Sequence, residues 1–386
     1  MVFGPGVMQG GLIIALAVSL LSIRETGPTI KLAFGSLLAG MAAVVLIAWM
    51  PSVFTSIEPL RSLEAWARIP LLMLGAVLLW SPLKNDPALH ALSLKALLCS
   101  GFFAAVVAIF VLNGGNLLLL SLQGQDIFYT PTKPLKAYSN ISMCLIPVVL
   151  WAGHFLKGRW QYAALGMICL NLVVIAQTGT GAAVAGLLAG GALVGFLAAL
   201  KGKKFLFAYF GVLAAAIAGT LSWLADKMNP EVPSPNIFPN WLVDGHRQYI
   251  WQFAYEKIWE SPWLGYGINA IDRIPGAKDH IPGIEHPYIP SHPHNAYLEV
   301  GAETGLVGLA VLVLVLIFFA LRLVSQYLAC AEGPLDQRLH ILALLFLWVG
   351  FWSSSALNFS LWSAWWELTL FTSLALLLAT PSRKQN

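Results

Sequence analysis

The sequence predicts an all-α membrane protein that crosses the bilayer many times and has one large outer loop. Of its 386 residues, 58% are hydrophobic and only 10% are charged, whereas a soluble domain carries about 25% charged residues. Apolar runs of about 18 residues, long enough to span a bilayer as helices, recur along the chain. Polar residues gather instead between residues 225 and 295. This composition excludes a soluble enzyme, and a net charge of only +4 gives no sign of a nucleic-acid partner.

The apolar runs predict about 11 or 12 transmembrane helices. They divide the chain into N-terminal helices (1–224), an outer loop (225–295) and C-terminal helices (296–386). The first run lacks a basic leader, so we interpret it as a span and not as a signal peptide. A re-entrant or interfacial segment is a further possibility for residues 115–122. The predicted spans are 5–22, 32–50, 67–81, 92–112, 139–156, 160–177, 180–200, 205–224, 296–321, 339–354 and 361–380.

Lysine and arginine in the short loops predict the orientation, because these residues are enriched on the cytoplasmic side of a membrane. If the C-terminal Arg383 and Lys384 are cytoplasmic, most basic loops fall on their side, although loops 51–66 and 113–138 are mixed. The long loop then faces outward. In a Gram-negative inner membrane this would be the periplasmic face.

The outer loop is expected to contain one helix between two irregular stretches. Residues 228–240 are rich in proline and should be extended or irregular. Residues 244–260 carry apolar side chains at helical spacing, with Asp244 as a helix cap. This Trp- and Tyr-rich helix would suit the lipid interface. Proline and glycine recur in residues 261–293, so we expect little regular structure there.

Arg247 and His294 are the strongest candidates for chemistry. An outward-facing arginine at a membrane can bind diphosphate oxygens through two hydrogen bonds, but it could instead pair with a carboxylate or with lipid headgroups. His294 lies where the loop meets the next span, and a neutral imidazole there could take a proton from a hydroxyl. The alternative for His294 is a structural role at the helix start.

Other polar residues support weaker hypotheses. Lys133 and Lys136 form a second outward basic spot, and Glu299 and Glu303 lie four residues apart on one face of a span, where carboxylates are often functional. Glu299 could orient His294. Zinc accepts histidine and carboxylate ligands, but the spacing of the loop's residues gives no compact ligand pair: His280, His286, His292, His294, Glu285 and Asp279. The chain has no phosphate-binding loop, no serine-hydrolase motif and no zincin motif.

Two motifs together resemble the O-antigen ligase and O-antigen polymerase family. The first is Arg247-Gln248-Tyr249-Ile250-Trp251, continuing to Pro262-Trp263-Leu264-Gly265-Tyr266-Gly267. The second is His294-Asn295-x-x-Leu298, continuing to Gly305-x-x-Gly308. The motifs flank the long outer loop late in the chain, which also matches the family. They cover about 65 residues, and the rest of the chain matches in topology alone.

The resemblance implies an inverting, metal-independent glycosyltransferase of the GT-C-like membrane class. Its donor would be a glycan on undecaprenyl diphosphate, and its acceptor a sugar hydroxyl of lipid A-core in lipopolysaccharide assembly. Arg247 would stabilise the diphosphate, and His294 would be the general base. No cofactor is expected. The residues expected to contact the substrates, besides these two, are Lys133, Lys136, Tyr249, Trp251, His292, Asn295 and Glu299.

One departure from the family concerns the donor site. Many members have a Ser-Arg pair where this chain has Thr178-Gly179-Thr180-Gly181-Ala182. If a second cation is needed, Lys136 or Lys133 must supply it. We prefer a ligase, because polymerases often have two comparable outer loops. A polymerase acting on lipid-linked repeat units remains open, as does a transporter or flippase. Transporters, however, often carry charges inside central spans, and spans five to eight are almost free of charge.

Overall fold

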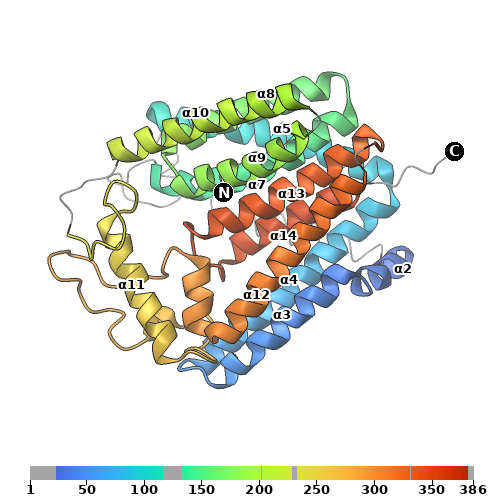
Figure 1. The fold of residues 1–386 in the computed structure, drawn as a ribbon. Coiled ribbons are helices and arrows are strands. Elements are labelled where there is room, and N and C mark those ends of the chain that lie inside the picture. The colour runs from blue at the N-terminus through green and yellow to red at the C-terminus, as the bar shows by residue number, and fades with distance from the viewer. Residues whose placement is uncertain (1–22, 116–131, 201, 228–232, 331, 381–386) are drawn as a thin grey trace.

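The computed structural model describes residues 23–115, 132–200, 202–227, 233–330 and 332–380. Within these residues the chain forms twelve α-helices and no β-strand. Nine of the helices are long and apolar enough to cross a membrane. The prediction of an all-α polytopic membrane protein is therefore confirmed (Figure 1).

Ten of the eleven predicted spans coincide with helices, and the first, 5–22, lies outside the described residues together with residues 116–122. The nine long helices are α3 (Leu37–Phe54), α4 (Pro59–Asn85), α5 (Pro87–Phe110), α7 (Thr132–Leu156), α8 (Arg159–Thr178), α9 (Gly181–Ala199), α10 (Lys203–Lys227), α12 (Ala296–Ala329) and α13 (Leu335–Ser355). The tenth is the shorter apolar helix α14 (Ala364–Leu378).

Helix α2 (Ile23–Phe34) was not predicted. Its sequence contains Arg24, Glu25, Lys31 and Pro28, so it has no long apolar run to mark it. The following span begins at Leu37, and not at residue 32 as predicted from the sequence. Ser36 caps it by accepting a hydrogen bond from the amide of Ala39 (3.2 Å).

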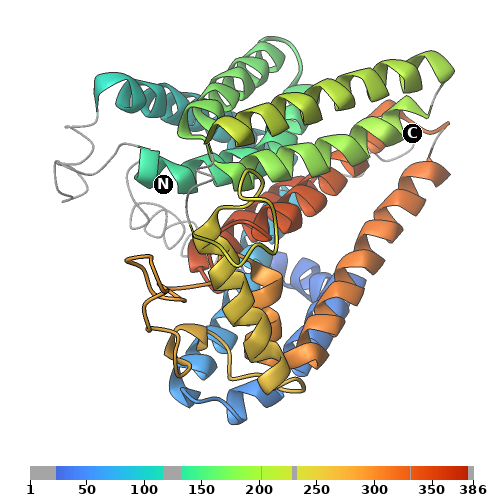
Figure 2. The same cartoon turned by 60° about the vertical axis from the view of Figure 1, so that its left-hand side comes forward.

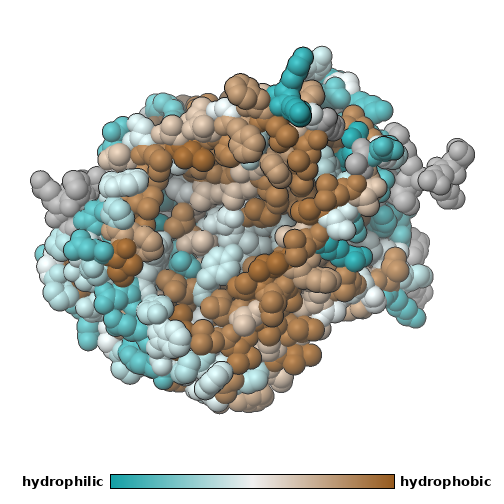
Figure 3. All heavy atoms as spheres, in the orientation of Figure 1, coloured by the Kyte–Doolittle hydropathy of each residue, from teal (hydrophilic) through white to brown (hydrophobic). Residues whose placement is uncertain are grey.

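Helices α13 and α14 lie between two groups of helices (Figures 1 and 2). The first group, α5 and α7 to α10, contacts them through α7 and α9, and the second, α2 to α4 and α12, contacts them through α4 and α12. Hydrophobic side chains cover the helices over the middle of the molecule, and hydrophilic ones gather toward its ends (Figure 3). This distribution is the one that a bilayer requires.

The outer loop contains α11 (Gly245–Glu260) and one short 3-10 turn, η2 (Ile271–Arg273). The prediction of one helix is confirmed. Its apolar face is not directed at lipid, however: Ile250, Phe253, Ala254 and Ile258 are buried against residues of α12 and of the loop. The exposed aromatic residues Tyr255 and Trp259 lie on the other face.

Helix α12 is broken near its start, which the sequence did not predict. Gly305 has φ 68° and ψ −178°, a left-handed conformation that side chains disfavour. Residues 296–304 therefore form a separate helical segment beside α11, and residues 306–329 form the long helix. The hydrogen bond from the Trp49 indole to the carbonyl of Gly308 (3.2 Å) holds α3 against the start of this long helix.

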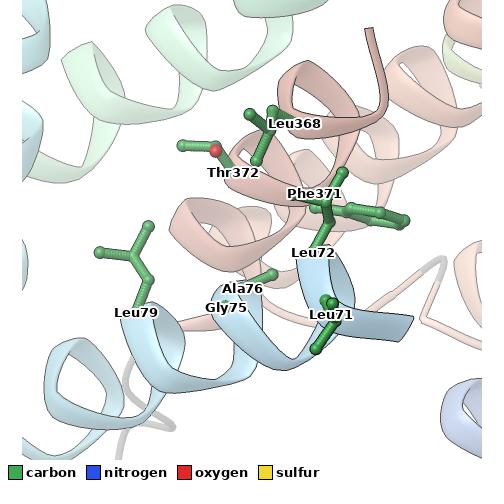
Figure 4. A pocket seen from close by; sticks show the side chains of 8 residues that line it. All are labelled: Leu71, Leu72, Gly75, Ala76, Leu79, Leu368, Phe371 and Thr372. Atoms are coloured by element: carbon green, nitrogen blue, oxygen red, sulfur yellow. The ribbon is translucent and has the colours of Figure 1, made fainter. Parts of the chain in front are cut away.

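The apolar pockets among the described helices include two that lie away from the outer loop. A small one of about 20 Å³, between α4 and α14, is lined almost entirely by apolar side chains such as Leu72 and Phe371 (Figure 4). A larger one of about 590 Å³ is lined by residues of α2, α3, α4, α12, α13 and α14. Neither is lined by Arg247 or His294.

Candidate functional site

Arg247 is placed by the first turn of α11. Asp244 caps this helix, because its carboxylate accepts hydrogen bonds from the amides of His246 (3.0 Å) and Arg247 (3.4 Å). Such caps satisfy amides that the helix leaves unpaired. The Arg247 guanidinium is partly buried, and burial lowers its pKa. Among the described residues it forms no close ion pair with a carboxylate, although the charge of Asp244 opposes the lowering of its pKa.

His294 is held in an unusual backbone conformation directly before α12. Its φ is 54°, which is uncommon outside glycine and is found at functional sites. Two neighbours hold it there. Asn295 caps α12 by accepting hydrogen bonds from the amides of Tyr297 (3.0 Å) and Leu298 (3.1 Å). The indole of Trp251 donates to the carbonyl of Pro293 (3.1 Å), which ties the segment to α11.

The imidazole of His294 stays neutral at physiological pH. Burial lowers its pKa to about 3, and the charges of His292 and Arg247 act in the same direction, whereas a hydrogen bond with the backbone of Asn358 opposes them. Burial and the charge of Arg247 likewise lower the pKa of His292 to about 4. Because the Trp251 indole of α11 donates to the carbonyl of Pro293 (3.1 Å), α11 and the end of the loop meet at one place. A neutral imidazole has a lone pair that can accept a proton.

The glycines of the two motifs bring their backbones together. A side chain on Gly265 would lie 2.5 Å from the carbonyl oxygen of Glu303, and one on Gly305 would lie 2.6 Å from the amide nitrogen of Leu264. This close approach allows Tyr266 to donate to Ala302 (3.0 Å), Gly267 to Glu303 (2.9 Å) and Leu306 to Pro262 (2.7 Å) through their backbones. The motifs, which are separate in sequence, thus form one folded unit.

Two buried carboxylates anchor loops around this unit. Glu303 accepts hydrogen bonds from the amides of Asn269 (2.7 Å) and Ile271 (2.9 Å) and from the indole of Trp362. Glu299 accepts from the amide of Leu361 (2.7 Å). The carboxylate of Glu299 is thus directed at the loop between α13 and α14. The sequence had instead suggested His294 as its partner.

This loop and α7 complete the surroundings of His294. Asn358 contacts the His294 ring through its backbone, and its side chain accepts a hydrogen bond from Asn140 of α7 (2.8 Å). The ring of Phe359 lies 5.9 Å from that of His292. Sequence reasoning missed Asn140, Asn358 and Phe359, because none stands in either motif. A polar residue in an apolar span, such as Asn140, was the one available signal.

The remaining expected substrate residues are Tyr249 on α11 and Lys133 and Lys136 at the start of α7. Tyr249 is on α11, with its ring 6.5 Å from that of Tyr288. Lys136 is exposed on the first turns of α7, and Lys133 precedes it in that helix. Ser139, one turn after Lys136, lies 2.8 Å from the hydroxyl of Thr178. The start of α7 therefore adjoins the Thr178–Ala182 stretch.

This chain is similar to a known protein family and to several known proteins. Residues 164–313 match the family model described as O-antigen ligase. Proteins named "putative polysaccharide ligase" are similar: that of Rickettsia conorii is 26% identical over 165 residues (41% of this chain, 38% of that protein), and that of Rickettsia felis is 24% identical over 332 residues (84% and 76%). The O-antigen ligase of Pseudomonas aeruginosa is 30% identical over 192 residues (49% and 41%).

The matches to the Rickettsia conorii and Pseudomonas aeruginosa proteins span well under half of those proteins. The match to the family model nevertheless extends from α8 into α12 and so includes Arg247, His294 and the break at Gly305. It covers both motifs on which the resemblance was based. The comparisons show that this chain is similar to the O-antigen ligase family over the region that holds both motifs.

Proposed function

We propose that this protein is an O-antigen ligase that transfers a polysaccharide from undecaprenyl diphosphate to a sugar hydroxyl of lipid A-core, at the periplasmic face of a bacterial inner membrane. One observation supports this most strongly. The guanidinium of Arg247 forms no ion pair with a carboxylate among the described residues, and its charge acts on the neutral imidazole of His294, whose segment is tied to the same helix by Trp251. A cation for a leaving diphosphate and a base for an attacking hydroxyl are what this transfer needs.

The proposed reaction is a single displacement at the anomeric carbon of the donor. His294 takes the proton of the acceptor hydroxyl while the acceptor oxygen forms a bond to that carbon. The bond from the carbon to the diphosphate oxygen breaks, and its electron pair leaves with the diphosphate. Arg247 stabilises the charge that develops on the leaving oxygens. The diphosphate is already a good leaving group, so the mechanism requires neither nucleotide nor metal. A single displacement inverts the anomeric configuration.

The low pKa of His294 suggests an order of events. Part of the lowering comes from the charges of His292 and Arg247. An anionic diphosphate bound at Arg247 would offset that positive charge and raise the pKa of His294 toward the range in which a general base is efficient. Donor binding would thus activate the base for the acceptor.

We further propose that Lys136 contributes the second cation to the diphosphate site. Its helix adjoins Thr178 through Ser139, beside the place where many family members carry an arginine. Lys133, Tyr249, Trp251, His292, Asn295 and Glu299 remain proposed substrate-site residues, and Trp251, Asn295 and Glu299 would act by holding the loops that frame the site.

The lipopolysaccharide profile of cells that lack this protein tests the proposal. We expect loss of long glycan from lipid A-core and accumulation of undecaprenyl-linked polymer, with restoration by the wild-type protein and not by the His294→Gln variant. Removing a general base lowers the rate about 100- to 10,000-fold. Cores that carry a single repeat unit would indicate a polymerase, and an unchanged profile would refute a role in lipopolysaccharide assembly.

A further inference from the structure

A chain of hydrogen bonds leads from Ser291 through His292 to His294. The hydroxyl of Ser291 lies 2.8 Å from Nδ1 of His292, and Nε2 of His292 lies 3.1 Å from Nδ1 of His294. The two imidazole rings are 4.2 Å apart between centroids, at 60° to each other. His292 lies outside the His-Asn-x-x-Leu signature, and the sequence marked it only as a residue expected to contact the substrates.

The chain of hydrogen bonds can have only two polarities, because a neutral imidazole has one N–H donor and one acceptor nitrogen. In the first, His292 donates to Nδ1 of His294. His294 then carries its proton on Nε2 and has no lone pair left for a substrate. In the second, Nδ1 of His294 donates to Nε2 of His292, and His292 donates from Nδ1 to the Ser291 hydroxyl. Only the second polarity leaves Nε2 of His294 able to act as a base, and it requires that the hydrogen bond from the His294 ring to the backbone of Asn358 is also donated by Nδ1.

We propose that His292 is a positioning residue that selects this second polarity. The inference rests on the proposed function and deepens it. His292 holds the proton of His294 on Nδ1, which directs the lone pair of Nε2 toward the acceptor hydroxyl. When Nε2 takes the acceptor proton, His294 becomes an imidazolium, and Nε2 of His292 continues to accept its Nδ1 hydrogen bond. No proton leaves His292 in this step. The orienting group is thus a neutral histidine instead of a carboxylate.

The surroundings of the pair favour a neutral His292. Among the described residues, the charged or titratable groups that act on the two rings are Arg247 and His246, both from α11. The loop between α13 and α14 contributes the backbone of Asn358 and the ring of Phe359. With the cation Arg247 nearby, a second positive charge on His292 would be unfavourable, so its role is to accept and donate hydrogen bonds without carrying charge.

Three variants of the full-length protein, assayed for glycan transfer after reconstitution, test the inference. His292→Phe keeps an aromatic ring but cannot accept a hydrogen bond; we expect kcat to fall about 10- to 100-fold, as for loss of the partner that orients a histidine, with an unchanged KM for the donor. His292→Gln offers a carbonyl oxygen in place of Nε2 and should retain most activity. His280→Phe, an exposed histidine of the same loop, is the matched control and should be unaffected.

The outcomes separate this inference from the proposed function. Wild-type kcat in His292→Phe, or an equal loss in His292→Phe and His292→Gln, would overturn the positioning role of His292. The His294→Gln variant is assayed in parallel. If it is inactive while His292→Phe is fully active, only the positioning role fails, and if it is active, the proposed general base fails as well.

A measurement on the wild-type protein does not depend on how the variants fold. Nitrogen-15 NMR of protein labelled at histidine distinguishes a ring protonated on Nδ1 from one protonated on Nε2, and loss of one signal in His294→Gln assigns it. We expect His294 to be neutral at pH 7 and protonated on Nδ1. A proton on Nε2 would contradict the inference.

Discussion

Gly265→Ala tests whether the two motifs fold as one unit through direct backbone contact. The added Cβ would lie 2.5 Å from the carbonyl oxygen of Glu303, about 1 Å closer than favourable contacts allow. Both sides are backbone, so no side chain can rotate away. The contact between residues 262–267 and residues 302–306 must open, which weakens three backbone hydrogen bonds of 3.0, 2.9 and 2.7 Å.

The expected loss of stability has two parts. Gly265 has φ 65°, and placing alanine in this left-handed region costs about 1–2 kcal/mol. Three weakened backbone hydrogen bonds, at about 1 kcal/mol each, add about 3 kcal/mol. Gly276→Ala is the matched control, because Gly276 has φ 86° in the same loop but its added Cβ would meet Phe253 at an ordinary 3.5 Å. Gly276→Ala should therefore lose only about 1–2 kcal/mol, the cost of alanine in the left-handed region.

Thermal unfolding of both variants in the same detergent, followed by tryptophan fluorescence, measures the difference. Gly265→Ala should unfold at a clearly lower temperature than Gly276→Ala and lose transfer activity, since the segment that carries His294 would shift. Equal stability of the two alanine variants would refute the argument that close backbone approach is what Gly265 provides.

Three further predictions concern the site. Arg247→Lys keeps the positive charge but loses bidentate hydrogen bonding to the diphosphate. We expect kcat to fall about 10- to 100-fold, which corresponds to the loss of one charge-assisted hydrogen bond. An unchanged kcat would show that the charge alone suffices. Asn295→Ala removes the cap of α12 and should lower the free energy of unfolding by about 1 kcal/mol, measured by denaturant titration against the wild-type protein; an unchanged value would contradict the role of this cap. Because the pKa values of His292 (about 4) and His294 (about 3) lie below the ordinary 6.5, the unfolded chain binds protons that the folded one does not. Stability should therefore fall as the pH decreases from about 6.5 toward 4, and an unfolding temperature that is constant over this range would contradict neutral, buried rings.

The sequence alone was sufficient to predict the spans and the helix of the outer loop, because both depend on local patterns. Apolar runs marked ten helices of the described residues, and Asp244 followed by apolar residues at helical spacing marked α11. Helix α2 was missed, since Arg24, Glu25 and Lys31 interrupt its apolar character. Hydropathy also could not show the break at Gly305, because an apolar run does not report backbone angles.

The partners of the site residues could not be predicted from sequence. Periodicity showed which face of α11 is apolar, but not that this face packs on α12. Glu299 stands one turn after His294 in the chain, yet its carboxylate binds the amide of Leu361, 62 residues away. Asn358 reaches His294 from the loop between α13 and α14. These contacts depend on how distant helices meet, which one sequence does not record.

The most direct test of the central claim is transfer by the purified protein from an undecaprenyl-diphosphate-linked glycan to lipid A-core, with determination of the new linkage by NMR. We predict transfer without added nucleotide or metal, inversion of the anomeric configuration, and a loss of about 100- to 10,000-fold in the His294→Gln variant. Transfer that proceeds equally well in the folded His294→Gln variant, or with retention of configuration, would contradict it.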